Sequence, residues 1–184
     1  MPIEITRDSL LIRSWQESDA DGLGHAVFDN LDHIRPWLPW ARGLPDDPAG
    51  VLEAIRQWLV EGVAKPDEAV GLFIDGDVVG GSGLHPRIGP GGLEIGYWVH
   101  RNFTRRGIAT TVSSALTDQA FGRPDIDRVE IHHDKANIAS GGIPRALGFS
   151  LVEEVPEVPQ TPQQSGVHLI WRLTRAQWSL PSGP

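Results

Sequence analysis

Apolar residues recur three and four positions apart in several stretches of the chain, the spacing of a helix that buries one face. One stretch opens at Pro48, a residue favoured at the first position of a helix, and Gly62 closes it. Another ends at Gly122, and Pro124 follows it as a helix breaker. The helices predicted in this way cover residues 19–31, 48–62, 107–121 and 137–147.

The stretches between these helices are short apolar runs bounded by turn residues, a pattern typical of strands. Asp75-Gly76-Asp77 is a hairpin signal between two of these runs. The predicted strands cover residues 10–12, 70–74, 78–84, 93–99, 128–133, 149–155 and 167–173. Residues 35–45, rich in Pro and Trp, predict extended or turn geometry, and residues 156–166 predict a surface loop. Helices inserted into a mixed sheet indicate a single α/β domain over residues 1–184.

Composition sets the class of protein. The 184 residues are enough to bury a core, and 40% hydrophobic with 22% charged residues is typical of a globular chain. The absence of cysteine excludes disulfides, thiolate metal sites and a cysteine acyl-enzyme. No apolar run approaches the ~20 residues of a membrane span, and no basic-then-apolar leader opens the chain. We therefore expect no membrane partner and a cytoplasmic location.

The net charge is −8 and the sequence pI is near 5.3. This charge argues against binding to a phosphate backbone, so nucleic acid is not an expected partner. An acidic surface favours a cationic substrate such as an amine, but it also serves solubility alone, and the sequence leaves both readings open.

The segment from Glu94 to Ala109 carries the strongest chemical signal. A predicted strand runs into a short basic turn, and a helix starts directly after it. The free backbone N–H groups and the dipole of the helix N-terminus both favour an anion at this turn. Arg105 and Arg106 add positive charge, and Gly107 allows a phosphate to approach the backbone. The segment therefore predicts a site for a phosphorylated cofactor.

This segment resembles the acyl-CoA-binding motif of the GNAT superfamily of N-acyltransferases, Gln/Arg-x-x-Gly-x-Gly/Ala, read here over residues 104–109. Thr104 departs from the motif at its first position, although Thr can still cap the helix. A second GNAT-like signature follows: Asn137-Ile-Ala-Ser140 resembles the opening of a helix that Leu147-Gly148-Phe149 closes. Residues 10–20 and 34–41 are similar to the RimJ/RimL branch, whose best-known members acetylate the N-termini of ribosomal proteins.

The resemblance implies a GNAT fold: a mixed, largely antiparallel sheet with about four helices, in which acyl-CoA binds where two adjacent strands splay apart. It implies acetyl-CoA as the acyl donor and no metal. The backbone of one splayed strand would contact pantetheine and the acyl carbonyl, and the turn would hold the pyrophosphate. Asn137 would reach pantetheine, with a simple turn or cap Asn as the alternative. Arg145 is either a ligand of the adenosine phosphate or a solvated surface residue. The cofactor residues implied are Tyr97, Trp98, Val99, Arg105, Arg106, Gly107, Ile108, Ala109, Thr110, Asn137, Ser140 and Arg145.

Two residues are candidates for catalysis. Glu94 lies in a strand on the face opposite Leu93 and Ile95, and it is a candidate general base, directly or through water. A solvent-facing structural Glu is the alternative. The resemblance places Ser140 near the cofactor sulfur, where it could donate a proton to the departing thiolate. The alternative for Ser140 is the N-cap of its helix.

The acceptor side is less defined. Trp37 and Trp40 are candidates to line an acceptor pocket, with a core or dimer contact as the alternative. His132 and His133 are neighbours in a strand and point to opposite faces, so they do not share a metal ion. We expect His133 to face the acceptor as a polar wall.

These features together predict an acetyl-CoA-dependent N-acetyltransferase in which a primary amine attacks the thioester directly in a ternary complex. The candidate acceptors are a protein or peptide N-terminus, an antibiotic, or a small polyamine-like metabolite, and the acyl group is acetyl or longer. A homodimer is possible. The alternative function is a non-catalytic acyl-CoA-binding sensor that uses the same anion site.

Overall fold

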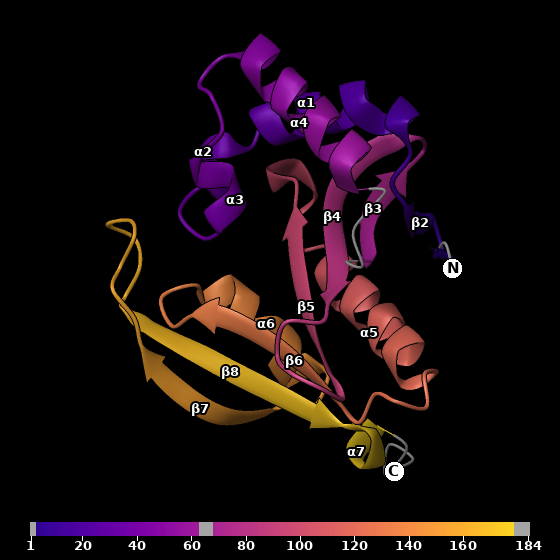
Figure 1. Ribbon diagram of the computed structural model, residues 1–184, viewed down its shortest axis with the longest axis vertical. Helices are drawn as coiled ribbons and strands as arrows, with labels where there is room; N and C mark the ends of the chain where they lie inside the picture. Colours follow the sequence, from indigo (N-terminus) through magenta and orange to yellow (C-terminus); the bar gives the residue numbers. More distant parts are fainter. Residues whose placement is uncertain (1–2, 63–67, 179–184) are drawn as a thin grey trace.

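The computed structural model describes residues 3–62 and 68–178, and it contains one eight-stranded sheet with helices on both faces (Figure 1). The strands are β1 (Glu4–Arg7), β2 (Leu10–Ser14), β3 (Glu68–Ile74), β4 (Asp77–His85), β5 (Gly92–Val99), β6 (Arg128–Asp134), β7 (Ser150–Pro156) and β8 (Val167–Thr174). Their order across the sheet is β1-β2-β3-β4-β5-β6-β8-β7. Every neighbouring pair is antiparallel except β5 with β6, which confirms the mixed, largely antiparallel sheet.

Four helices of nine residues or more correspond to the four predicted helices. They are α1 (Ala20–Phe28), α4 (Pro48–Gly62), α5 (Ile108–Phe121) and α6 (Ile138–Ala146). The other helical elements are single turns: η1 (Glu17–Asp19), α2 (Leu31–Ile34), α3 (Pro39–Arg42), η2 (Arg101–Phe103) and α7 (Arg175–Trp178). The Pro/Trp-rich segment is therefore partly helical, because Pro39 occupies the first position of α3, where its missing N–H costs nothing.

Two apolar cores lie on the two faces of the sheet. The larger core joins α5 to the sheet through residues such as Leu116, Ile95 and Ile131. The smaller core joins α1, α2, α3 and α4, and Trp98 of β5 packs against it. Because neighbouring residues of a strand point to opposite faces, β5 contributes Ile95 to one core and Trp98 to the other.

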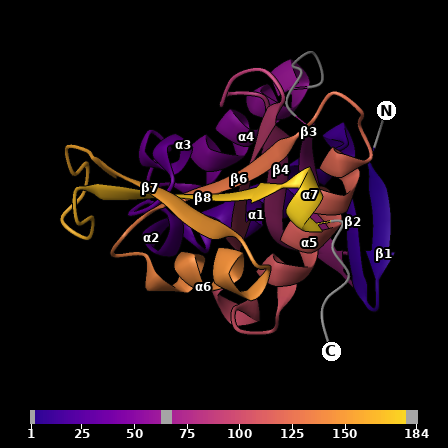
Figure 2. The same ribbon diagram turned by 90° about the horizontal axis from the view of Figure 1, so that it is seen from below.

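The predicted hairpin over Asp75-Gly76 is confirmed. Both residues have positive φ (52° and 91°), as a two-residue turn between twisted strands requires. The loop at residues 157–166 connects β7 and β8, and Figure 2 shows this hairpin projecting from the rest of the molecule. Its inner side is held by Thr161 and Gln164, which both donate hydrogen bonds to the carbonyl of Pro36 (3.2 and 3.0 Å).

The helix at residues 19–31 is shorter than its apolar pattern predicted: α1 ends at Phe28, and α2 begins at Leu31. Asn30 lies between them and is fully buried. Its side-chain amide donates to the carbonyl of Ala26, four residues earlier (2.7 Å). Such side-chain bonds compete with the backbone ladder and favour helix ends.

Candidate active site

β5 and β6 lie side by side only at their first residues. Gly92, Leu93 and Glu94 pair with Arg128, Val129 and Glu130, respectively. Beyond these pairs, residues 95–99 follow β4 and residues 131–134 follow β8, so the two parallel strands diverge (Figure 1). We call the space between these two segments the β5–β6 opening. It is the splay that the sequence led us to expect.

The basic turn lies between the end of β5 and the start of α5. Gly107 is the N-cap of α5 and has φ 77°, and a Cβ added there would meet no atom within 4 Å. Arg105 also has a positive φ, 62°. The first N–H groups of α5, those of Ile108, Ala109 and Thr110, have no partner within the helix and lie at the positive end of its dipole. This geometry fits a phosphate group.

Two polar contacts fix the shape of this turn. The buried Asn30 accepts a hydrogen bond from the N–H of Arg101 (2.7 Å), which ties η2 to the end of α1. Thr104 does not cap α5, because its hydroxyl donates to the carbonyl of Arg101 (2.9 Å) and closes η2 instead. The guanidinium of Arg106 lies 4.9 Å from the centre of the Phe103 ring, a cation–π distance. Asn30 was missed in the sequence because a single Asn within an apolar helix pattern carries no motif.

Ser140 and Tyr97 meet across one side of the β5–β6 opening. The Tyr97 hydroxyl donates to the Ser140 carbonyl (3.0 Å) and lies 3.0 Å from the Ser140 hydroxyl, where either oxygen can be the donor. Asn137, and not Ser140, is the N-cap of α6: its side chain accepts from the Ser140 N–H (3.2 Å). The alternative of Ser140 as a cap is therefore wrong, and its hydroxyl is available for another role.

Burial raises the pKa of Tyr97 to about 12, although its hydrogen bond with Ser140 acts in the opposite direction. The phenol therefore keeps its proton at neutral pH and can donate a hydrogen bond. The sequence assigned Tyr97 to backbone contacts only. Its side chain was missed because no residue pattern links β5 to a serine forty-three positions away.

Glu94 lies at the closed end of the opening, on the opposite face of the sheet from Tyr97 and Ser140. Its carboxylate is only 10% exposed and accepts two hydrogen bonds from Arg87 (2.8 and 2.5 Å). Burial acts to raise the pKa of Glu94, but the Arg87 hydrogen bond and the charges of His132, Arg87 and His85 outweigh it, and the pKa is lowered. A paired carboxylate of lowered pKa is a weak proton acceptor near neutral pH.

His133 does not face the acceptor side as expected. It is buried beneath α6, where its Nδ1 donates to the Asp134 carbonyl (2.8 Å) and its Nε2 accepts from the Trp171 indole (3.0 Å). Burial lowers the pKa of His133, which keeps the ring neutral in the stack against Trp171. The phase of β6 instead places His132 on the face that Glu94 occupies.

Arg145 contacts the protein and not the basic turn. Its guanidinium lies over the Trp171 ring at 4.9 Å and donates to the Gly141 carbonyl (3.2 Å). The reading of Arg145 as a ligand of the adenosine phosphate stays a prediction.

The two candidate acceptor tryptophans lie at the segment that connects α2 to α3 and in α3 itself. Trp40 is 45% exposed and meets the Trp98 ring edge to face, 6.4 Å between centres. Trp37 is half-buried next to Pro36, the residue that the 157–166 loop contacts. A Cβ on Gly81 would lie 2.6 Å from the Trp98 indole nitrogen, so Gly81 is required where Trp98 lies against β4. Trp98 thus adds a side chain to the acceptor side, beyond its expected backbone role.

Within residues 3–62 and 68–178, no group of three or more His, Asp or Glu side chains is placed to hold a metal ion. Over the described part of the chain, no helix is long and apolar enough to cross a membrane. The homodimer and the cytoplasmic location stay predictions.

Gly141 and Gly142 of α6 allow a direct test of how the His133 ring packs beneath this helix. Gly141→Ala places a Cβ 2.9 Å from the buried His133 ring, whereas a Cβ on Gly142 meets nothing within 4 Å. We expect Gly141→Ala to lower the free energy of unfolding by about 1–2 kcal/mol through overpacking. Gly142→Ala should raise it by about 0.5–1 kcal/mol through helix propensity. Urea titration of both variants measures their free energies of unfolding, and equal values would contradict the placement of His133 beneath α6.

Comparison with known proteins agrees with this geometry. Residues 9–150, more than half of the chain, match the family model described as an acetyltransferase (GNAT) domain. The chain therefore belongs to the GNAT family of acetyltransferases, and it is an acyltransferase of that class.

Individual proteins similar to this chain include ribosomal-protein acetyltransferases. The chain is 26% identical over 144 residues to a Bacillus subtilis protein named "Putative ribosomal N-acetyltransferase YdaF", covering 77% of this chain and 78% of that one. Among solved structures, the RimL ribosomal L7/L12 α-N-protein acetyltransferase in complex with coenzyme A superposes with a TM-score of 0.81 at 19% identity, covering 95% of this chain and 99% of RimL. Mycobacterium smegmatis RimJ in complex with a CoA-disulfide gives a TM-score of 0.75 at 19% identity, covering 97% and 89%. At these identities, the two structures show the fold.

Proposed function

We propose that this protein transfers the acetyl group of acetyl-CoA to the α-amine at the N-terminus of a protein. The observation that carries the proposal is the β5–β6 opening, with a turn at one end whose geometry fits a phosphate and the paired hydroxyls of Tyr97 and Ser140 on one face. Two relatives support the acceptor class, since YdaF is named a putative ribosomal N-acetyltransferase and RimL a ribosomal L7/L12 α-N-protein acetyltransferase.

The residues present fit an acyl-CoA. The N–H groups of Ile108, Ala109 and Thr110 and the charge of Arg105 and Arg106 suit the pyrophosphate. The backbone of residues 97–99, which lies beyond the last pair with β6, suits the pantetheine arm. The Asn137 side-chain oxygen caps α6, so its amide nitrogen is the group left for the same arm. When bound, acetyl-CoA supplies the thioester carbonyl that the amine attacks.

Ser140 and Tyr97 would act on the leaving group. Their hydroxyls form a short chain that ends beside the opening, and the raised pKa of Tyr97 keeps a proton in it at neutral pH. A hydroxyl at this place can donate to the sulfur as the carbon–sulfur bond breaks. The acidity of a thiol makes CoA a fair leaving group, so this donation adds a moderate factor.

Cofactor binding should stabilise the folded protein. Acetyl-CoA should raise the melting temperature, and desulfo-CoA should raise it nearly as much, because the turn binds phosphates and the opening binds pantetheine. Binding to the folded state alone contributes about 2.7 kcal/mol at a hundredfold excess over Kd. Differential scanning fluorimetry measures this effect, and an unchanged melting curve at millimolar cofactor would contradict the proposed site.

The acceptor class is tested with a peptide panel. Three classes of amine are each incubated with acetyl-CoA. The first is a peptide with a free N-terminus. The second is the same peptide with its N-terminus acetylated and an internal lysine free, and the third is a small amine such as spermidine. We expect CoA release and acetylation at the α-amine of the first class, mapped by mass spectrometry. Faster turnover of the lysine or polyamine substrates would contradict the proposed α-amine acceptor but not the proposed acetyltransferase activity. CoA binding without turnover of any amine would support the sensor alternative.

A further inference from the structure

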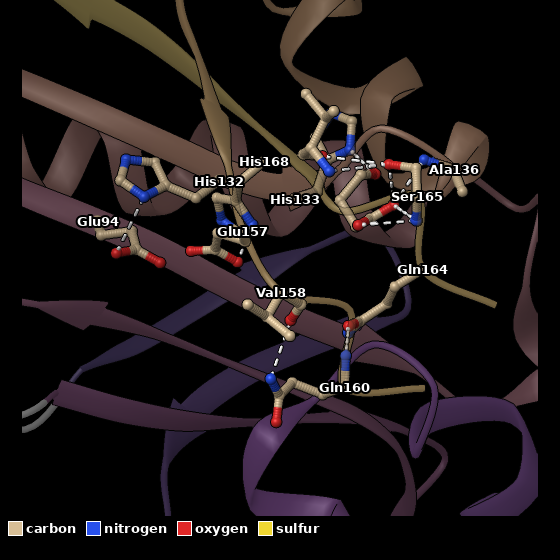
Figure 3. Close-up of polar contacts among 12 residues, drawn as sticks. Glu94, His132, His133, Ala136, Glu157, Val158, Gln160, Gln164, Ser165 and His168 are labelled. Atoms are coloured by element: carbon tan, nitrogen blue, oxygen red, sulfur yellow. Dashed lines mark hydrogen bonds and ion pairs between the residues drawn. The ribbon is translucent and has the colours of Figure 1, made fainter. Parts of the chain in front are cut away.

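A histidine lies between two carboxylates on the acceptor side of the sheet. Nε2 of His132 is 2.7 Å from the Glu130 carboxylate, and Nδ1 is 3.6 Å from the Glu94 carboxylate. Both carboxylates already have an arginine partner: Arg87 holds Glu94, and Arg172 holds Glu130 (2.7 and 2.6 Å). Figure 3 shows the His132 ring turned toward Glu94.

These distances indicate which tautomer the neutral His132 ring adopts. An acceptor-only carboxylate at 2.7 Å from Nε2 requires a hydrogen on that nitrogen. The neutral ring then carries its lone pair at Nδ1, and 3.6 Å to Glu94 is too long for a direct hydrogen bond. Nδ1 is therefore the one nitrogen of His132 able to take up a proton.

We propose that His132 is the general base of this enzyme and takes a proton from the acceptor ammonium at Nδ1. The inference rests on the proposed function and names a residue for its base. Glu94 acts here as a positioning residue, and its charge attracts the positive charge that the imidazole acquires.

The location of His132 suits this role. It stands on β6 two residues beyond Glu130, the last residue of β6 that pairs with β5, and so on the wall of the β5–β6 opening. Tyr97 and Ser140 lie on the other face of the sheet. An amine that enters from the His132 face can thus attack a thioester in the opening while the sulfur leaves toward Ser140.

One proton of the ammonium moves to Nδ1 of His132, and the freed lone pair of the nitrogen forms the C–N bond to the acetyl carbonyl carbon. The C–S bond breaks, and its electron pair stays on sulfur. Sulfur takes a proton from the Ser140 hydroxyl, which regains it, through the Tyr97 pair or solvent, as the new amide nitrogen loses its second proton. His132 returns its proton to solvent.

Charged groups surround the ring from each element packed against it. β5 contributes Glu94, paired with Arg87, and β4 contributes His85 opposite Glu94 in register. β6 and β8 contribute the other neighbours, and the hairpin loop adds a carboxylate 3.4 Å from the neighbouring histidine. These neighbours are Glu130, Arg128, Arg172, His168 and Glu157. The two nearest side chains are carboxylates, those of Glu130 and Glu94. Glu94 is a poorer candidate because Arg87 occupies both of its oxygens and lowers its pKa.

The experiment compares His132→Gln with His168→Gln, whose ring lies 5.9 Å from His132 on the same face and does not contact Glu94. With the amine that the parent protein acetylates fastest, we expect His132→Gln to lower kcat/KM for the acceptor by about 100-fold or more. The rise in rate with pH on the acidic side of the pH–rate profile, here called the acidic limb, should disappear. Acetyl-CoA affinity and the melting temperature should stay near the parent values. His168→Gln should stay within threefold and keep the limb. A His132→Gln protein that keeps the limb and stays within threefold of the parent would overturn the proposal.

A spectroscopic measurement on the unliganded parent protein keeps the proposal testable if the variant fails to fold. Long-range ¹H–¹⁵N correlation spectra report the tautomer of each histidine. We expect the neutral His132 ring to carry its hydrogen on Nε2 near pH 8, and a hydrogen on Nδ1 would overturn the proposal. A parent protein that turns over no amine would refute the proposed function, whereas parental turnover with an unchanged His132→Gln profile would refute only the base.

Discussion

Replacing Ser140 with Ala is expected to lower kcat and kcat/KM together by roughly 10- to 1000-fold, while the affinity for acetyl-CoA changes little. The reason is that the hydroxyl would donate to the sulfur mainly as the carbon–sulfur bond breaks, so the ground state loses nothing. We expect the lower half of this range, because the thiolate of CoA is already a fair leaving group.

Stability separates this role from a structural one. Asn137 caps α6, so Ser140→Ala should leave the cap intact and cost little stability. Ser113→Ala is the matched control, because the Ser113 hydroxyl is buried in α5 and has no hydrogen-bond partner among the described residues. It should keep the parental kcat. A folded Ser140→Ala protein with the parental kcat at saturating acetyl-CoA would remove the acid role.

Tyr97→Phe extends the same test. If the two hydroxyls act as one proton-donating unit, the double variant should be little slower than the slower of the two single variants. Stopped-flow or steady-state assays of CoA release by the parent, the two single variants and the double variant complete this double-mutant cycle. Effects that multiply would instead mean that Tyr97 and Ser140 act independently.

Gly107→Val is expected to weaken CoA binding by on the order of 100-fold, about 3 kcal/mol. A branched side chain at a positive φ strains the N-cap of α5 and fills the open space where the phosphates would lie. Several charge-assisted backbone hydrogen bonds would be lost or bent, each of which contributes about 1.5–3 kcal/mol. Isothermal titration calorimetry with CoA measures the loss.

Gly76→Val is the matched control for backbone strain. Gly76 also has a positive φ, and a Cβ there also meets nothing within 4 Å, but it lies in the β3–β4 hairpin turn. Both variants should lose about 1–3 kcal/mol of stability, and only Gly107→Val should lose CoA affinity. Equal affinities for the two variants would place the cofactor elsewhere.

The long elements of this fold were predictable because each carries its own local signal. Pro48 and Gly62 bound α4 as expected, and Asp75-Gly76 forms the expected hairpin turn. β1 was missed, since its sequence, Glu-Ile-Thr-Arg, is mostly exposed and shows no apolar alternation. It exists through its pairing with β2, which local pattern does not report.

The candidate site was predictable where backbone conformation alone defines it. The turn around Gly107 follows from local sequence, because a strand, a glycine and a helix start suffice to define it. Side-chain partners across the sheet were not predictable. The phase of β6 decides that His132, and not His133, shares a face with Glu94, and the Arg87 pair that weakens Glu94 as a base comes from a separate loop. The same limit hid the contact of Tyr97 with Ser140.

The central claim is that the β5–β6 opening catalyses acetyl transfer to a free amine. The most direct test measures CoA release together with acetyl incorporation, using purified protein, acetyl-CoA and a peptide whose N-terminus is either free or blocked. The account predicts one CoA released for each acetyl group found on the α-amine, and no release with the blocked peptide that lacks lysine. Equal CoA release with free and blocked peptides, or none with any amine despite saturated CoA binding, would contradict it.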